Sequence, residues 1–336
     1  MNNANPWVAN GEVSLADGSD TGVLTASAID KLVAEGKATQ SRAKVTIYGV
    51  YVSDVIDITR HLSALVGLRL DNYSGGSMYA TEEVKDQLSF SQKLGLVFQP
   101  LPDKLSLFAN YMNGFTNNDP VSVYDKDGKF VKTKVLDPEH ANQWEAGVKA
   151  NLWDERLTLT ASYYDIRVGN RSMTDPDNPL NTVQGGVERS KGVELSLTAN
   201  PLTGLNVIMG YSYNDNKITK DAADGDYLGR RSESAGPAHM FNLWASYRFF
   251  TGALKGWSVG LGGNAASENK ILNRRSTGTF ALPGYVVVNG LLSYTGDRYT
   301  ISLKADNLLN KKYYNGWSTV SPQRLFNVSI GAEYRF

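Results

Sequence analysis

From about residue 42 onward, apolar and polar side chains alternate over stretches of roughly ten residues, which turn-forming residues separate. The end of the chain shows the pattern most clearly, because every second position is apolar: Phe326, Val328, Ile330, Ala332, Tyr334 and Phe336. Successive side chains of a β-strand point to opposite faces. Each stretch is therefore predicted to be a strand with one apolar and one hydrophilic face.

About thirteen such strands are predicted, near residues 42–56, 61–72, 88–98, 104–115, 142–152, 156–168, 187–200, 203–216, 238–249, 256–267, 283–294, 298–308 and 324–336. Short turns alternate with long polar connections, near 73–87, 116–141, 169–186, 217–237, 268–282 and 309–323. Short turns on one rim and long loops on the other are typical of an antiparallel up-and-down meander.

A water-soluble β-sandwich also alternates, but three features favour a transmembrane β-barrel. The strands are about ten residues long, whereas soluble strands usually have five or six. The loop lengths sort by rim. Aromatic residues gather at strand ends, where a headgroup-level girdle would lie; they are Trp144, Trp153, Tyr163, Tyr164, Tyr211, Tyr213, Tyr247, Phe249, Trp257, Tyr294, Tyr334 and Phe336.

The hydrophilic faces carry many charges: Arg69, Asp71, Glu145, Lys149, Glu194, Arg248, Lys304, Asp306, Glu333 and Arg335. A small packed barrel cannot bury so many charges, because each unpaired one is costly. We therefore expect a large all-β barrel whose interior is wet or filled by another polar domain.

Composition excludes several classes of function. The 34 Lys and Arg residues balance 34 Asp and Glu residues, so no net charge attracts nucleic acid, and no nucleic-acid partner is expected. The absence of cysteine excludes disulfides, thiolate zinc sites and cysteine nucleophiles. No run approaches 18 apolar residues, which excludes a transmembrane helix. The first residues, Met1 to Pro6, lack the basic and apolar regions of a secretory signal.

Residues 1–41 lack the alternation and are predicted to form an outer-loop segment. Within them, Ser27-Ala28-Ile29-Asp30 resembles a capping box that opens a short helix ending near Gly36.

Two segments, Ser190–Glu194 and Asp306–Tyr314, resemble sequence motifs of TonB-dependent outer-membrane receptors, in particular ferric-siderophore receptors. Weaker similarities follow the family's order along the chain, in Tyr48–Asp54, Leu65–Asp71, Gln143–Lys149 and Tyr163–Ile166. The ending Tyr334-Arg335-Phe336 is similar to the terminal aromatic signal that outer-membrane barrels present to their assembly machinery.

The resemblance covers about residues 42–336 and implies the C-terminal part of the receptor's β-barrel, about 13 strands of a 22-stranded barrel, with the plug domain absent. An open sheet of this kind leaves two unpaired edges in hydrocarbon. We therefore expect the chain to be the C-terminal fragment of a longer receptor that does not transport alone.

The resemblance also implies a function: TonB-dependent uptake of a ferric siderophore across the outer membrane of a Gram-negative bacterium. The iron would be carried as ferric siderophore, with no cofactor bound by side chains. The expected partners are the TonB energy-coupling protein acting through the missing plug, outer-membrane lipid and lipopolysaccharide, and the barrel-assembly machinery, through Phe336.

A ferric siderophore is large, oxygen-rich and often aromatic, so its site should offer aromatic rings and Arg or polar donors on the outer rim. By loop polarity, the ligand-binding candidates are Tyr73, Tyr79, Tyr124, Tyr227, Arg230, Arg231 and Trp317. The competing interpretation assigns the aromatic residues to the girdle, and the arginines to lipopolysaccharide or to charge pairs in the lumen.

Three acidic segments, Asp125–Gly128, Asp175–Asn178 and Asp221–Asp226, offer clustered oxygen atoms suited to calcium. They do not have EF-hand spacing, and turn-forming loop tips are the favoured interpretation, so no metal site is predicted.

No catalytic constellation is found, since His61, His140 and His239 are far apart, and no enzyme is expected. Three alternatives stay open: a passive porin-like barrel without a plug, a carbohydrate-importing receptor of the same architecture, and an outer-membrane enzyme testable at His140 and His239.

Overall fold

The computed structural model describes Ser27, Asp30, Lys31, Ala34 and Glu35 and residues 45–75, 86–118, 120–175, 177–222, 225–316 and 320–336. Thirteen strands form one sheet, in which every strand is antiparallel to its neighbours. They are β1 (Val45–Thr59), β2 (Leu62–Gly75), β3 (Gln87–Leu101), β4 (Leu105–Thr116), β7 (Glu139–Leu152), β8 (Leu157–Thr174), β9 (Thr182–Ala199), β10 (Leu205–Lys220), β11 (His239–Arg248), β12 (Trp257–Ala266), β15 (Tyr285–Thr295), β16 (Tyr299–Asp306) and β19 (Asn327–Tyr334). The thirteen predicted strands are confirmed.

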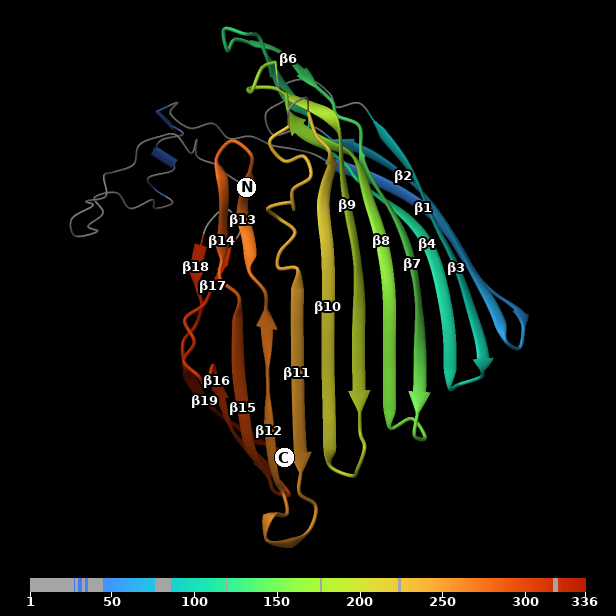
Figure 1. Cartoon of the computed structure of the whole chain (residues 1–336), viewed down its shortest axis with the longest axis vertical. Helices are drawn as coiled ribbons and strands as arrows, with labels where there is room; N and C mark the ends of the chain where they lie inside the picture. The colour runs from blue at the N-terminus through green and yellow to red at the C-terminus, as the bar shows by residue number, and fades with distance from the viewer. Residues whose placement is uncertain are drawn as a thin grey trace, which may run out of the picture.

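The strands lie side by side in one curved sheet, a partial barrel with β1 and β19 at its two edges (Figure 1). Short turns join them at the lower rim of the view and long connections join them at the upper rim, as predicted. We call these the short-turn rim and the long-loop rim. The short turn between β11 and β12 includes one 3₁₀ turn, Gly252–Leu254.

Three small hairpins lie within the long connections and were not predicted. They are β5 (Val121–Tyr124) with β6 (Phe130–Lys134), β13 (Asn269–Arg274) with β14 (Gly278–Leu282), and β17 (Tyr314–Gly316) with β18 (Val320–Pro322). The expected loop 169–186 is also wrong in extent, because β8 and β9 continue pairing up to Thr174 and Thr182. The ladder survives there because the chain absorbs a bulge at Asn170, whose φ is 61°, before pairing resumes.

One face of the sheet is apolar and exposed. Val50 on β1 is 75% exposed, and Ile330 on β19 is 77% exposed. Only six hydrophobic residues are buried among those that the structure describes. No second large sheet in the described part of the chain covers this apolar face, which excludes the sandwich and matches a surface in contact with acyl chains.

The opposite, polar face holds its charges in pairs of residues two positions apart on one strand. Arg69 bonds Asp71 at 2.6 Å, and Lys304 lies 3.0 Å from Asp306. Some aromatic rings lie flat on this face over glycines of the next strand: a Cβ atom on Gly147 would lie 2.5 Å from Cζ of Phe108. Such glycines leave the interior wide.

Aromatic residues of the apolar face form a belt near each rim. Near the short-turn rim, the Trp257 and Tyr294 rings have centroids 5.4 Å apart. Near the long-loop rim, the Tyr111 and Trp144 centroids are 4.6 Å apart. Tyr164 is an exception to the predicted girdle, because it points to the polar face, where its hydroxyl accepts a hydrogen bond from Asn214.

The described residues of the N-terminal segment include four with helical backbone, Ser27, Asp30, Lys31 and Ala34. The Glu35 amide donates to the Lys31 carbonyl at 2.9 Å. Within the described residues, no helix is long and apolar enough to cross a membrane.

The segment Asp306–Tyr314 includes Asn307, which is 2% exposed and whose side chain makes a network of three hydrogen bonds to the backbone. Its Nδ2 donates to the carbonyls of Lys311 and Arg324, and its Oδ1 accepts the Lys311 amide. Asn307 also has a φ of 51°, a left-handed conformation that asparagine tolerates better than most residues. This hydrogen-bond network stabilises the turn that follows β16 at the long-loop rim.

Replacing Asn307 with alanine should lower the free energy of unfolding by about 2–4 kcal/mol, because it leaves three part-buried backbone groups without partners. The measurement is urea unfolding of the protein in bilayers. Asn310→Ala is the matched control, since Asn310 has a similar φ of 47° and one exposed side-chain bond, to the Phe326 amide. Equal losses of unfolding free energy in the two variants would refute the role assigned to the Asn307 hydrogen-bond network.

Candidate functional site

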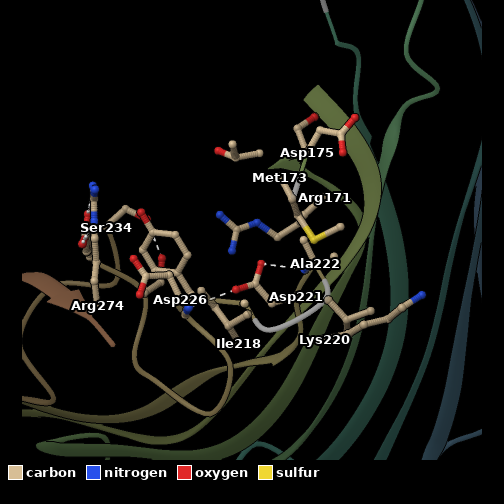
Figure 2. A pocket seen from close by; sticks show the side chains of 18 of the residues that line it. Arg171, Met173, Asp175, Ile218, Lys220, Asp221, Ala222, Asp226, Ser234 and Arg274 are labelled. Carbon is tan, nitrogen blue, oxygen red and sulfur yellow. Dashed lines mark hydrogen bonds and ion pairs between the residues drawn. The ribbon is translucent and has the colours of Figure 1, made fainter. Parts of the chain in front are cut away.

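A polar cavity of about 550 Å³ lies at the long-loop rim, against the polar face of β8–β10 (Figure 2). Its charged and aromatic lining comes from three segments that are distant in sequence. Arg171 and Asp175 lie at the end of β8, and Arg274 lies on β13. The third segment is the end of β10 with the 221–238 loop that follows it, and it contributes Lys220, Asp221, Asp226, Tyr227 and Glu233. Cavities of 300–1,000 Å³ suit ligands of drug size.

Arg171 reaches the cavity because of the bulge at Asn170, which shifts the register of β8 and turns the arginine to the polar face. Its guanidinium forms an ion pair with Glu188 of β9. Glu188 also accepts a hydrogen bond from Asn216 of β10. Figure 2 shows the Arg171 guanidinium pointing into the cavity, toward the side where Asp221 and Asp226 lie.

The 221–238 loop folds over the polar face of β10, and Arg231 holds it there. The guanidinium donates to the carbonyl oxygens of Asn214, Gly236 and Pro237 at 2.7, 3.0 and 3.2 Å. The Ser232 amide adds a bond to Oδ1 of Asn216 at 2.9 Å. Burial lowers the pKa of Arg231, which still keeps its charge because arginine does not lose its proton in proteins.

The other side of the loop is tied to the β13–β14 hairpin. Glu233 pairs with Arg274 at 3.1 Å, and the Arg274 guanidinium lies 5.4 Å from the centre of the Tyr227 ring. Asp226 accepts bonds from the amide and hydroxyl of Ser276, both at 2.6 Å, and these bonds lower the pKa of its carboxyl group. Asp226 is therefore ionised at neutral pH.

Tyr227 contributes a neutral phenol to the cavity. Burial raises the pKa of its hydroxyl above the usual value, so the proton is retained at physiological pH. The phenol can therefore donate a hydrogen bond to an anionic oxygen of a ligand.

Of the predicted ligand-binding residues on the 221–238 loop, Tyr227 alone lines this cavity. Arg230 donates to Asn273 at 3.0 Å and points to the β13–β14 hairpin. Arg231 is committed to the carbonyls that hold the loop.

The other candidates lie elsewhere. Tyr124 ends β5, where its ring packs edge-on against Phe130 at 6.3 Å and its backbone bonds Asn178 and Asn181. Tyr73 lies near the end of β2, on the same face as Asp71. Tyr79 and Trp317 lie outside the described residues.

Sequence reasoning missed three cations of the cavity, Arg171, Lys220 and Arg274. The Gly169-Asn170 pair was the available signal for Arg171, since both residue types favour a bulge or turn inside a strand. Arg274 carried no signal, because the hairpin that places it was not predicted.

The acidic segments use their carboxylates to close turns. The Asp125 carboxylate accepts the amides of Asp127 and Lys129, and Asp221 accepts those of Ala222 and Tyr227. Asp175 accepts the amide of Asp177. Over the described ranges, no group of three His, Cys, Asp or Glu residues is placed to hold a metal ion.

The histidines do not meet. His61 lies in the turn before β2, where its Nδ1 is 2.8 Å from the Gln99 carbonyl oxygen. His140 pairs with Phe115 and Gly169 near the start of β7. His239 is the first residue of β11, and its Nδ1 lies 2.9 Å from the Tyr211 hydroxyl.

The cavity at the long-loop rim combines hydrogen-bond donors, cations and carboxylates, which suit the binding of a polar ligand.

The comparisons with known proteins agree with this architecture. A sequence profile described as "TonB dependent receptor-like, beta-barrel" matches residues 4–308. The chain belongs to the TonB-dependent receptor family. Barrels of this family in Gram-negative bacteria are outer-membrane proteins. Because outer-membrane barrels have short periplasmic turns and longer extracellular loops, the long-loop rim is the outer rim.

Two curated relatives are receptors for metal complexes. The metal-pseudopaline receptor CntO of Pseudomonas aeruginosa is 27% identical over 89% of this chain and 42% of its own length. The ferrichrome outer membrane transporter/phage receptor of Escherichia coli is 28% identical over 79% of the chain and 34% of its own length. The chain therefore spans less than half of each relative.

The crystal structure of the P. aeruginosa ferripyoverdine receptor bound to ferripyoverdine superposes with a TM-score of 0.72. The superposition covers 88% of this chain and 40% of that receptor, at 23% identity. This likeness supports the fold.

Arg231→Met should detach the 221–238 loop, because the part-buried carbonyls that Arg231 bonds would each lose a partner, at a cost of up to about 1–3 kcal/mol. Amide hydrogen exchange across residues 228–238 of the natural-length receptor should accelerate at least tenfold. Arg230→Met is the matched control and should change exchange little, since its two bonds are peripheral. Unchanged exchange in Arg231→Met would contradict the anchoring role.

Proposed function

We propose that this chain is the ligand-collecting barrel wall of a receptor for TonB-dependent uptake of a ferric siderophore. The observation that carries the proposal is the outer-rim cavity, whose lining combines the Arg171 guanidinium and the neutral Tyr227 phenol with carboxylates. The relatives support it, since their names include receptors for ferrichrome and for ferripyoverdine.

The cavity chemistry suits such a ligand. Ferric siderophores present oxygen atoms that bear partial or full negative charge, and charge-assisted hydrogen bonds to these atoms are about twice as strong as neutral ones. Arg171 supplies a cation, and Tyr227 supplies a donor. Lys220 also lines the cavity, but Figure 2 shows its amino group directed away from Arg171 and Asp221.

The proposed partners follow from the same architecture. TonB would act through a plug domain, and further antiparallel strands would pair with the open edges of β1 and β19. The apolar face would contact outer-membrane lipid and lipopolysaccharide, and Phe336 would present the assembly signal. Iron would be cargo carried by the siderophore, and the receptor would perform no covalent chemistry.

The test is iron uptake by cells that carry the natural-length receptor as their single siderophore receptor. The probes are ferrichrome, ferripyoverdine and metal–pseudopaline, with an oligosaccharide for the carbohydrate alternative. One of the metal complexes should be taken up, and uptake should stop when TonB is deleted. Uptake that survives this deletion would indicate the passive porin, and uptake of the oligosaccharide alone would indicate the carbohydrate receptor.

Arg171→Gln should weaken binding of that complex about tenfold, because a charge-assisted bond contributes about 1.5–3 kcal/mol. Arg171→Lys should retain more affinity, since it keeps the charge. Arg275→Gln is the matched control: Arg275 is exposed in the neighbouring turn and does not line the cavity. Equal affinity of Arg171→Gln and Arg275→Gln, measured by equilibrium binding to the purified receptor, would move the ligand site elsewhere.

A further inference from the structure

The outer-rim cavity carries more negative than positive charge. Four carboxylates and three cations line it. One of these cations, Lys220, directs its amino group away from the cavity (Figure 2), and a Cβ atom on Gly185 of β9 would lie 3.7 Å from the Lys220 Nζ atom. The positive charge that faces the cavity therefore comes from Arg171 and Arg274.

Both of these guanidinium groups already have a carboxylate partner. Arg171 pairs with Glu188, which does not line the cavity, and Arg274 pairs with Glu233 at 3.1 Å. The two positive charges are therefore largely neutralised by the protein itself. Each group can still donate hydrogen bonds to a ligand, because a guanidinium has five N–H donors.

The three other carboxylates, those of Asp175, Asp221 and Asp226, have no such partner. In the described part of the chain, no nitrogen of Lys, Arg or His lies within 4.0 Å of them. Backbone amides orient all three, and the Ser276 hydroxyl also bonds Asp226. These neutral donors hold the carboxylates in place without cancelling their charge. The Arg274 guanidinium attracts Asp226 from beyond ion-pair distance.

The walls between these charges are partly apolar. Met173, Val187 and Ile218 line the cavity, and Ile218 is only 9% exposed. Charges interact more strongly beside apolar walls than on an open surface, because less water screens them. The charge of a ligand should therefore have a large effect on its affinity for this cavity.

Iron(III) complexes with siderophores differ in charge. Three singly charged hydroxamate groups neutralise the iron, whereas three doubly charged catecholate groups leave a triply negative complex. Like charges brought together at an interface select against a ligand, and opposite charges favour it. A protonated amine on the ligand would gain charge-assisted hydrogen bonds from the carboxylates of the cavity.

We propose that the outer-rim cavity selects ferric siderophores by charge and takes complexes that combine a neutral iron centre with a protonated amine. The amine bonds the carboxylates of Asp175, Asp221 and Asp226. Oxygen atoms of the same complex accept hydrogen bonds from Arg171 and Tyr227. The cavity rejects triply negative tris-catecholate complexes. This inference rests on the proposed function and adds the class of siderophore that the same site prefers.

The test is equilibrium binding of three ferric complexes to the purified receptor, followed by quenching of its tryptophan fluorescence. Ferrioxamine B is a tris-hydroxamate complex with one protonated amine, and its N-acetyl derivative lacks that charge at nearly equal size. Ferric enterobactin is a tris-catecholate complex. Ferrioxamine B should bind at least about tenfold more tightly than its acetylated form, because it gains hydrogen bonds between charged groups. Ferric enterobactin should bind most weakly.

Asp175→Asn tests whether the cavity carboxylates cause this preference. The variant removes one charge and keeps an oxygen that can accept the Asp177 amide. It should weaken binding of ferrioxamine B about fivefold and leave the acetylated complex unchanged. Asp177→Asn is the matched control, since Asp177 is exposed in the same loop, does not line the cavity and carries equal charge. Unchanged binding of the acetylated complex also shows that each variant is folded.

Equal affinity of the wild-type receptor for ferrioxamine B and its acetylated form would overturn the inference. Tighter binding of ferric enterobactin would also overturn it, as would equal effects of Asp175→Asn and Asp177→Asn. If none of the three complexes binds, the inference fails as well. The proposed function fails by a different observation, the absence of TonB-dependent uptake of any metal complex, so the two failures are distinguishable.

Discussion

A backbone amide or carbonyl inside a bilayer has no water to bond with, so it must find a partner within the protein. The antiparallel ladder from β1 to β19 meets this requirement along the whole sheet. It confines turns and hairpins to the two rims, and the hydrocarbon around the sheet requires the apolar side chains to share one face. The ladder ends at β1 and β19, which are the two edges of the sheet. The polar face does not pack against a second large sheet in the described part of the chain, and its charges lie in local ion pairs such as Arg69 with Asp71.

The strands were predictable because the bilayer imposes a strong contrast between alternate positions. Leu195 and Leu197 face lipid on β9, whereas Glu194 and Ser196 face the interior. This contrast disappears above the membrane, where both faces of a strand meet water. The ends of β8 and β9 and the β5–β6 hairpin therefore carried no periodic signal, although their backbones pair regularly.

The candidate site was predictable only in part. Tyr227 was named because an aromatic residue in a long outer loop is suited to a siderophore, and it lines the cavity. The cavity itself arises from contacts between segments far apart in sequence. Arg231 reaches back to Asn214, and Glu233 reaches forward to Arg274. Such pairings depend on the folded path of the loop, which single-sequence periodicity does not encode.

The most direct test concerns the assignment of the two faces. Because the chain contains no cysteine, single substitutions Glu194→Cys, Leu195→Cys, Ser196→Cys and Leu197→Cys on β9 allow a spin label at each position of the natural-length receptor in bilayers. Labels at 195 and 197 should collide with membrane-dissolved oxygen, and labels at 194 and 196 should be shielded from it. Uniform oxygen accessibility along the four positions, or the opposite alternation, would contradict the lipid-facing apolar wall.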